Sequence, residues 1–581
     1  MRFYRAFGAL AALTAAMVCN VACKHKEAEP AASNASWQEE VRTRRAQIER
    51  AKAENSAGFE AMDVGSLGNA TLEMIPYVVF RVLQETEPAT FGDDAMNASG
   101  FFPRKDLPSG HNGIIWTDPT QADGTFRLRY MTRTCSSCHT GRVRLDDGTM
   151  RLIVGGANTE IGLHGFIGRI TSTLKADLGE SADALAYKAS RKRILAGLAS
   201  HEPGWFFGAG KVAPADAAQE VATVTANIDA VLALMRTMND RRLQSIALLQ
   251  AHSYAKVPNP PSLTGGAPGL IETSGLGSVG LVRFVGVDKA DSVLPPGPSK
   301  ADIPAIWQID PTGYANWDGT IRGFARALTS SMAVVGDPLK IDLSANVKIQ
   351  DFLGKLPPEP YPFSIDEAAR RRGEVTYQTS CAGCHAKPSG RKRNDLVFDV
   401  GTDPLRAEAI GTLSAGLLTK VVMSICPQTQ VECAFGAEGP IVDPSAHRGY
   451  VAGPLDGVWA VAPYLHNGSV PTLRQVLVPS HCGRKLRSCG GARPITKLTA
   501  VGSGNRQRKL SCAGGVTLRL RSTIFGKPVS APWDMDPWSI RCSSMVAESP
   551  CGWHGRTMRQ TNASSMISSH TCFRCRRIVP L

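Results

Sequence analysis

Blocks with helical patterning alternate with loop-rich stretches along this chain. Residues 35–57 are polar and rich in helix-forming residues, and they predict a helix. Residues 180–201 and 214–252 also predict helices, because apolar residues in the second block recur three and four positions apart. Residues 124–133 alternate apolar and polar positions and predict a strand, whereas the Pro and Gly of residues 256–304 predict long loops. The pattern therefore predicts helices joined by long loops, with few strands.

A boundary is predicted at residues 353–364, where the sequence reads "LGKLPPEPYPFS". After it, Ser364 and Glu367 form a capping box, which predicts a helix that runs to about Tyr377. That helix leads the chain directly into Cys381.

The first 23 residues have the pattern of a secretory signal peptide. Arg2 and Arg5 precede an apolar run rich in Ala and Leu that is too short for a comfortable membrane span. A lipid anchor at Cys23 stays open as an alternative, although Asn20 stands where lipoprotein signals usually carry leucine. Residues 24–74 follow as a leader and an N-terminal helix. We therefore expect an exported protein, soluble or tethered outside the inner membrane.

The positive charge of the chain is concentrated at one end. The 581 residues contain 65 Lys and Arg against 51 Asp and Glu, a net charge of +14. Residues 481–581 alone contain 17 basic and 3 acidic residues, so the first 480 residues contain 48 of each. The high pI therefore describes the tail, and it gives no reason to expect a nucleic-acid partner.

The tail, residues 481–581, differs from the rest of the chain in composition. It carries seven cysteines, few acids and little helical periodicity, and "TCFRC" is followed by Arg576 where a haem motif requires histidine. The abrupt change favours out-of-frame translation or a sequence error. The alternative is a basic extension that binds an acidic partner or a membrane surface.

Two pentapeptides carry the clearest chemistry: "CSSCH" at residues 135–139 and "CAGCH" at residues 381–385. In a C-x-x-C-H motif the two thiols form thioether bonds to the porphyrin, and the histidine takes the proximal position on the iron. A zinc ribbon would need further paired ligands, and a thioredoxin-like redox pair needs only one motif in a βαβ setting. The motifs therefore favour two covalently attached c-type haems, held by Cys135, Cys138 and His139 and by Cys381, Cys384 and His385.

Longer stretches around these motifs resemble diheme c-type cytochromes related to bacterial rubber oxygenase. The resemblance is carried by residues 133–170, by "YPFSIDEAARRRGEVTYQTSCAGCH" (361–385), by "VGTDPLR" (400–406) and by "GYVAGPLDGVWAVAPYLHNGSVPTLRQVL" (449–477). Diheme cytochrome c peroxidases and MauG-type enzymes are more distant relatives. The resemblance implies a mainly α fold with two packed c-type cytochrome domains, at residues 75–352 and 353–480, in the bacterial periplasm or outside the cell.

The resemblance also implies a division of labour between the haems. His139 would be the proximal ligand of a haem that binds oxygen or peroxide, and His385 that of a haem that transfers electrons. His466 is the best candidate for a second axial ligand, and Trp307 or Trp317 for an electron relay between the haems. A redox partner protein or a small electron donor would supply the electrons.

Other residues have weaker indications. Arg322 and Arg326, four apart, could contact haem propionates, although a solvated helix face explains them equally well. His111, His164, His201 and His252 are candidates for a distal ligand of the first haem, none of them favoured. Cys426 and Cys433 predict a local disulfide.

Three hypotheses about function stay open at this point. The first is a haem-dependent oxidoreductase, peroxidase-like or dioxygenase-like, with chemistry at the His139 haem. The second is a non-catalytic electron carrier. The third is an exported binding protein without haem that zinc or disulfides stabilise.

Overall fold

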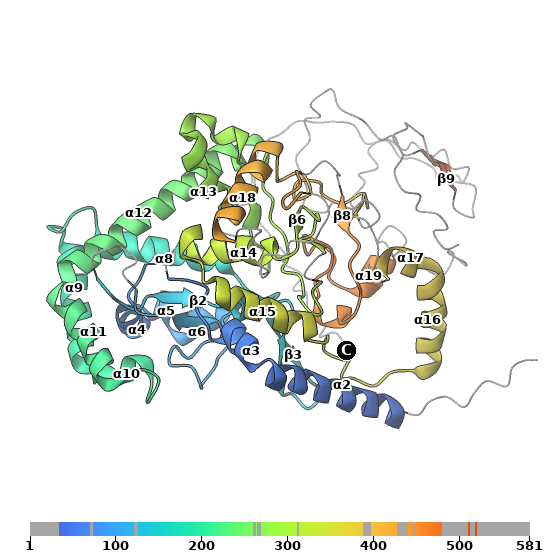
Figure 1. The fold of residues 1–581 in the computed structure, drawn as a ribbon, viewed down its shortest axis with the longest axis horizontal. Coiled ribbons are helices and arrows are strands. Elements are labelled where there is room, and N and C mark those ends of the chain that lie inside the picture. Colours follow the sequence, from blue (N-terminus) through green and yellow to red (C-terminus); the bar gives the residue numbers. More distant parts are fainter. Residues whose placement is uncertain are drawn as a thin grey trace, which may run out of the picture. The chain divides into compact units, whose positions relative to one another are not determined.

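The chain forms helices joined by loops and a few two-stranded sheets (Figure 1). The structure, a computed structural model, describes residues 34–69, 74–120, 126–258, 263, 269–310, 313–386, 397–426, 440–444, 449–478, 509–511 and 517–519. About 54% of these residues are helical, which confirms the prediction of a mainly α fold. The predicted signal peptide, Cys23 and most of the tail lie outside the described residues, and the two haem-domain ranges stay predictions.

The first part of the chain contributes most of its helices to one apolar core. Its helices are α2 (Asn34–Glu54), α3 (Ser56–Asp63), α4 (Tyr77–Thr86), α5 (Pro88–Phe91), α6 (Asp93–Ala98), α7 (Ser136–His139), α8 (Leu163–Leu178), α9 (Leu185–Ser200), α10 (Pro203–Phe207), α11 (Pro214–Ala226) and α12 (Ile228–His252). The core contains fully buried aromatic side chains such as Tyr77, Phe80 and Phe166. The helix predicted over residues 214–252 is two helices, because the backbone leaves the helical region at Asn227.

The second part of the chain contains a helix that the sequence did not predict. Its helices are α13 (Thr273–Val285), α14 (Ala325–Val335), α15 (Leu343–Lys355), α16 (Glu367–Ser380), α17 (Ala382–His385), α18 (Thr412–Ile425) and α19 (Leu473–Leu477), with short 3-10 turns at Tyr254–Lys256, Val287–Ser292, Pro338–Lys340 and Val458–Ala460. The prediction of loops over residues 256–304 is wrong for α13. Its glycines disfavour a helix in isolation, but Leu281 and Val282 are buried and the side chain of Glu272 caps its first turn.

The strands are short and pair only in twos. The antiparallel pairs are β1 (Ile114–Trp116) with β2 (Met131–Arg133), β3 (Thr140–Arg144) with β4 (Met150–Val154), β5 (Tyr314–Ala315) with β6 (Ile321–Arg322), β7 (Val397–Phe398) with β8 (Tyr450–Val451), and β9 (Lys509–Ser511) with β10 (Thr517–Arg519). The strand predicted over residues 124–133 is therefore regular only at its end, directly before Cys135.

A second core joins residues from both sides of the predicted boundary at 352/353. Helices α13, α14 and α18 lie side by side in it (Figure 1), and Leu281, Leu328 and Val422 are among its buried side chains. An ion pair between Arg406 and Asp318, both almost fully buried, connects the same two stretches. A third, smaller core contains residues of α2, α3, α14 and α15.

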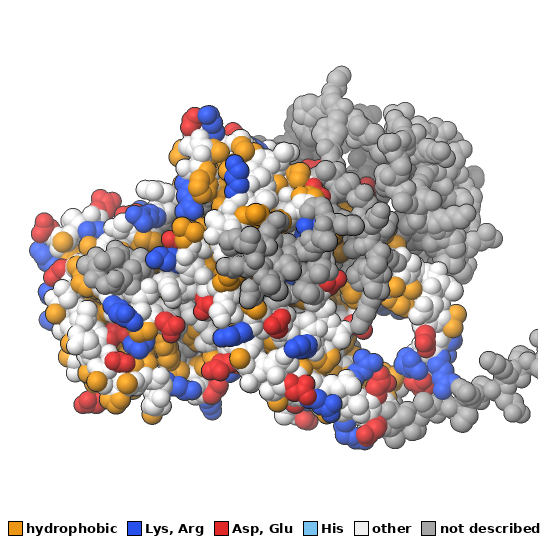
Figure 2. Space-filling view, in the orientation of Figure 1, with side chains coloured by type: hydrophobic (Ala, Val, Ile, Leu, Met, Phe, Trp, Pro, Cys, Tyr) orange, Lys and Arg blue, Asp and Glu red, His pale blue; other side chains and the backbone are white. Residues whose placement is uncertain are grey.

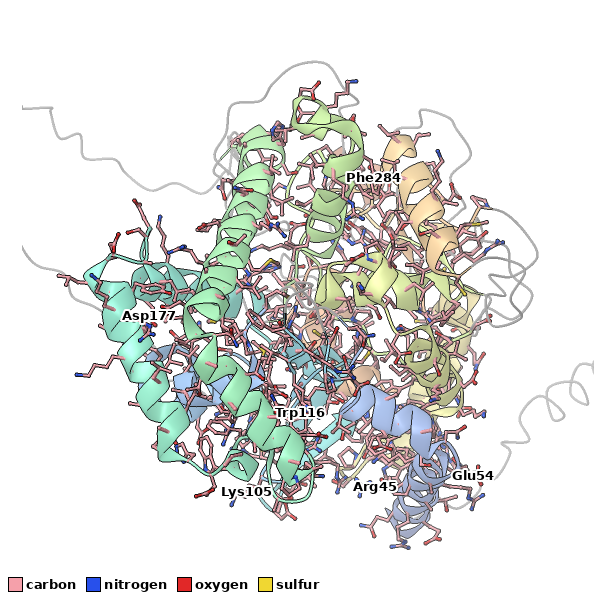
Figure 3. The ribbon with its side chains drawn as sticks, turned by 60° about the vertical axis from the view of Figure 1, so that its left-hand side comes forward. Arg45, Glu54, Lys105, Trp116, Asp177 and Phe284 are labelled. Carbon is pink, nitrogen blue, oxygen red and sulfur yellow. The ribbon has the colours of Figure 1, made fainter. Side chains whose placement is uncertain are left out.

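The N-terminal helix α2 contacts the linker 353–364. The indole N–H of Trp37 donates to the Phe363 carbonyl (3.3 Å), and Arg45, which Figure 3 shows on α2, forms an ion pair with Glu359 (3.4 Å). Helix α16 follows the linker as predicted, but the capping residue differs. Asp366, and not Ser364, accepts the hydrogen bond from Ala369 N (3.0 Å).

The visible face of the described residues carries acidic and basic side chains in alternation (Figure 2). Within the described part of the chain, no helix taken alone has the length and apolar character to cross a bilayer, although the bent pair α11 and α12 has them together.

Candidate haem-binding sites

Both C-x-x-C-H pentapeptides fold into the same tight helical turn. The histidine amide of each donates to the carbonyl of the first cysteine, over 2.8 Å from His139 to Cys135 and 2.9 Å from His385 to Cys381. A strand, β2, leads into the first turn, whereas helix α16 leads into the second (Figure 1). All four cysteines are free thiols with part of their surface accessible. Each turn thus offers two thiols and an imidazole within five residues.

The two imidazoles are oriented in the same way. His139 Nδ1 lies 3.1 Å from the Pro304 carbonyl oxygen, and His385 Nδ1 lies 2.9 Å from that of Gly453. Because a carbonyl oxygen can only accept, Nδ1 is the protonated nitrogen in both rings. Nε2 therefore keeps its lone pair, which is the arrangement that second-shell carbonyls impose on metal-binding histidines.

The spacer residues of the first pentapeptide are buried and held by side chains from distant parts of the chain. Asn112 Nδ2 donates to Ser136 O (2.8 Å), and Asn158 Nδ2 donates to Ser137 O (2.7 Å). Ser136 Oγ donates to Asp63 Oδ1 (3.0 Å) at the end of α3. Sequence reasoning missed these supporting residues, since they lie 21 to 73 positions from their partners and belong to no motif.

Burial sets the protonation of the first site. It lowers the pKa of His139 to about 4, an effect that the hydrogen bond to Pro304 opposes and the charge of Arg326 strengthens. Burial also raises the pKa of the Cys135 thiol to about 12 and raises that of Cys138. At neutral pH the site therefore presents a neutral imidazole beside two neutral thiols.

The second site is much more open. No residue of α16 or α17 is buried, and Gly383 in the spacer is exposed. The hydrogen bond from His385 to Gly453 connects this turn to residues 449–478. The two sites thus share the same local geometry but differ in how far their spacer residues are buried.

Both candidate relay tryptophans lie between the segments that hold the two imidazoles. Trp307 Nε1 donates to Val154 O (2.8 Å), and a Cβ atom at Gly155 or Gly457 would overlap its ring. Gly155 N donates to His139 O (2.9 Å), whereas Gly457 lies four residues after Gly453.

Trp317 makes a second connection between the same segments. Its Nε1 donates to Asp302 O (2.7 Å), and its carbonyl accepts from Val451 N (2.7 Å).

The ring of His466 is buried and has no hydrogen-bond partner among the described residues. Its side chain is 2% exposed and stacks on Tyr450 with ring centroids 4.0 Å apart. Neither ring nitrogen has a hydrogen-bond partner among the described residues. Burial lowers its pKa to about 4, and nearby Arg406 adds to this effect. Since buried polar groups are almost always paired, this ring is a candidate for coordination.

The other candidate histidines each bind a protein group in the structure. His111 Nδ1 contacts Ser109 O (2.7 Å), and His164 Nε2 accepts from Glu272 N (2.6 Å). His201 and His252 contact Glu85 (2.9 Å) and Asp291 (3.0 Å) at the surface. Within the described residues, none of these four histidines forms a hydrogen bond with the first pentapeptide.

The remaining predicted residues are placed as follows. Arg322 is buried on β6, and its Nε has no hydrogen-bond partner within the described chain. Arg326 lies in the first turn of α14 and donates to Gln350 Oε1 (3.0 Å). Cys426 is disulfide-bonded. Because Cys433 lies outside the described residues, their pairing stays a prediction.

The donor sets fit haem better than a bare metal ion. Among the described residues, no group of three or more His, Cys, Asp or Glu side chains could hold a metal ion. A c-type haem needs only two thiols for its thioether bonds and one imidazole for its iron, and each turn supplies these.

Residues 449–485 match a family described as RoxA-like, cytochrome c-like. This match supports a relation to the rubber oxygenase family. The matched segment contains Gly453, Gly457 and His466, which contact His385, Trp307 and Tyr450 in the structure. A cytochrome c-like domain implies covalently bound haem c, so the prediction of a c-type cytochrome with this cofactor is confirmed. The number of haems stays a prediction.

Two curated relatives come from Sinorhizobium fredii (strain NBRC 101917 / NGR234). The uncharacterized protein y4iM is 38% identical over 204 residues, which cover 32% of this chain and 46% of the relative. The uncharacterized protein y4iJ is 26% identical over 221 residues, which cover 28% of this chain and 36% of the relative. This chain therefore matches less than half the length of either relative, and their names state no activity.

Proposed function

We propose that this chain is an exported diheme c-type cytochrome with oxidoreductase activity. Oxygen or peroxide chemistry takes place at the haem bound by Cys135, Cys138 and His139, and the haem at Cys381, Cys384 and His385 transfers electrons. The observation that carries this proposal is the pair of equivalent turns, each with two free thiols and an imidazole whose Nδ1 binds a carbonyl. A redox partner protein or a small donor supplies electrons in the bacterial periplasm or outside the cell.

Covalently bound haem supplies one-electron redox chemistry and, where one axial position is open, binds oxygen or peroxide. The protein residues supply attachment, orientation and control of solvent. Asn112, Asn158 and Asp63 hold the first turn in the interior, which suits a site where a reactive species must be kept from water. The open surroundings of the second turn suit contact with an electron donor.

His466 is proposed as a residue that would bind the iron of the second haem. Its ring is buried without a hydrogen-bond partner in the described residues, and coordination would supply one. Trp307 is proposed as the relay, since its ring packs between Gly155 and Gly457. Gly155 is hydrogen-bonded to His139, and Gly457 lies four residues after Gly453, which accepts the hydrogen bond from His385. Trp307→Phe should slow electron transfer between the haems more than Trp317→Phe.

Spectroscopy of the purified full chain tests the proposal. A pyridine haemochrome assay should give two haems c per chain, and Cys384→Ser and Cys138→Ser should each disturb one. Ferric EPR should show one low-spin signal and one signal that changes with cyanide or peroxide. A chain without covalent haem would refute the proposal and favour the hypothesis of a binding protein. Two low-spin haems that bind no added ligand would favour the hypothesis of a non-catalytic electron carrier.

A further inference from the structure

Arg326 is a partly buried cation that has no carboxylate partner among the described residues. It lies in the first turn of α14, and its Nη2 donates to the neutral Oε1 of Gln350 on α15 (3.0 Å). Among the described residues, no Asp or Glu forms an ion pair with it. Burial lowers the pKa of Arg326 to about 10, and the more distant charge of Asp310 only partly opposes this. The side chain nevertheless stays charged at neutral pH.

The surroundings of Arg326 connect it to the first haem motif. Its helix, α14, reaches the strand before the motif, because Arg133 Nη2 donates to Ala333 O (3.4 Å). Val334 and Val335 of α14 lie in the same apolar cluster as Leu353 of α15, and Cys135 packs against it. Helices α14 and α15 thus lie beside the first pentapeptide.

A partly buried guanidinium is stabilised by an anionic partner, because water solvates its charge only incompletely there. Carboxylates are the partners that a guanidinium binds best, since its donors match the two oxygens. Haem carries two propionate carboxylates on the edge of the ring opposite the thioether bonds. Arg326 is only partly covered in the structure, so donors other than the one on Gln350 are available.

We propose that Arg326 binds a propionate carboxylate of the haem attached at Cys135 and Cys138, and that its positive charge raises the reduction potential of this haem. This inference rests on the proposed function, because it requires haem at the first motif. A cation beside the haem favours the reduced iron, which has one positive charge fewer. Arg326 would therefore contribute to the difference in potential between the two haems.

The test is a spectroelectrochemical titration of the purified holoprotein that follows each haem separately. In Arg326→Gln, the ratio of reduced to oxidised first haem at the wild-type midpoint should fall about tenfold, equivalent to about 59 mV for one electron. The second haem should keep its midpoint. Arg326→Lys should retain most of the wild-type value, because it keeps the charge. Arg191→Gln is the matched control, since it removes one charge from an exposed pair with Asp229, where solvent screens it.

A second variant leaves Arg326 in place. Gln350→Glu turns an amide whose Nε2 has no partner in the described residues into a carboxylate, so that it competes with the propionate for the guanidinium. It should lower the first midpoint as well, and it covers the case in which Arg326→Gln does not fold.

The outcomes separate the two proposals. Unchanged first midpoints in folded Arg326→Gln and Gln350→Glu chains with two haems would refute the propionate contact and leave the proposed function standing. A wild-type chain without covalent haem would refute both. A first midpoint that depends on acetate concentration in the wild type, but not in Arg326→Gln, would show that Arg326 binds an exchangeable anion, which also refutes the propionate contact.

Discussion

The imidazoles of His139 and His385 show what single residues contribute at these sites. The C-x-x-C-H motif identifies the histidine from the sequence, because the spacing is fixed by the porphyrin. The carbonyl that orients each ring comes from Pro304 or Gly453, which lie 165 and 68 residues away. The ligand is therefore visible in the sequence, whereas the atom that fixes its tautomer is not.

Asn158 offers a test of how strongly the first turn is held. Its fully buried side chain donates to Ser137 O and to Gly100 O (2.8 Å), so Asn158→Ala leaves two buried carbonyls without this donor. We expect a loss of about 2–4 kcal/mol in the free energy of unfolding, measured by urea denaturation. The absorption spectrum of the first haem should change as well.

The matched control is Asn239→Ala. Asn239 is also buried and donates to one carbonyl, that of Thr171, in a helical region. This variant should lose stability without a change in either haem spectrum. Equal spectral changes in both variants would show that Asn158 has no special relation to the haem motif.

His164 gives the protein a predicted sensitivity to acid. Its Nε2 accepts from Glu272 N, and burial, with help from Lys300, lowers its pKa from 6.5 to about 4. The unfolded chain binds this proton below pH 6.5, whereas the folded chain does so only near pH 4. The stability that the neutral ring contributes is therefore present above pH 6.5 and is lost as the pH falls toward 4. The loss at pH 5 should be about 2 kcal/mol.

Urea denaturation at pH 8, 7 and 5 measures this effect. His164→Gln can still accept from Glu272 N but does not titrate, so its stability should fall less between pH 7 and pH 5 than that of the wild type. Both proteins should change alike between pH 8 and pH 7. Identical pH dependence over the whole range would exclude the role of His164.

At the scale of elements, local patterns predicted a helix poor in glycine better than a glycine-rich one. The helix through residues 185–200 lies within the range that the sequence predicted. Helix α13 was missed, because its three glycines within the helix resemble a loop, and only the burial of Leu281 and Val282 explains why it forms. Helix propensity gives way to tertiary burial in such segments.

The start of α16 tests the two capping residues against each other. The sequence predicted Ser364, but in the structure Asp366 accepts from Ala369 N. Asp366→Ala should destabilise the first turn of α16 by about 1 kcal/mol, whereas Ser364→Ala should have little effect. Because α16 buries no residue, the loss should appear as faster amide hydrogen exchange within the helix, with little change in global stability. Faster exchange in Ser364→Ala alone would show that Ser364 caps the helix, as the sequence predicted.

At the scale of the whole molecule, the sequence predicted a boundary at residues 353–364, of which residues 353–355 belong to α15, and it did not predict the packing across this boundary. The core that contains α13 and α14 also contains Ile410, Leu418 and Val422 from beyond the linker. Arg406 and Asp318 form a buried ion pair across the same boundary. Such contacts leave no signal in one sequence, because each partner alone resembles an ordinary core or surface residue.

This shared core predicts that the chain will stay together when the linker is cut. Burying the Ile, Leu and Val side chains that residues 410–442 contribute to this core adds on the order of 10 kcal/mol before the cost in chain entropy. We expect a chain cleaved at a protease site inserted between residues 356 and 362 to elute as one species in size-exclusion chromatography. Denaturant should then separate the fragments.

Val422→Asp places a charge in this core, so the cleaved variant should separate without denaturant. The uncleaved variant should only be less stable. Separation of the cleaved wild type into two folded fragments would instead show that residues 353–480 form an independent domain.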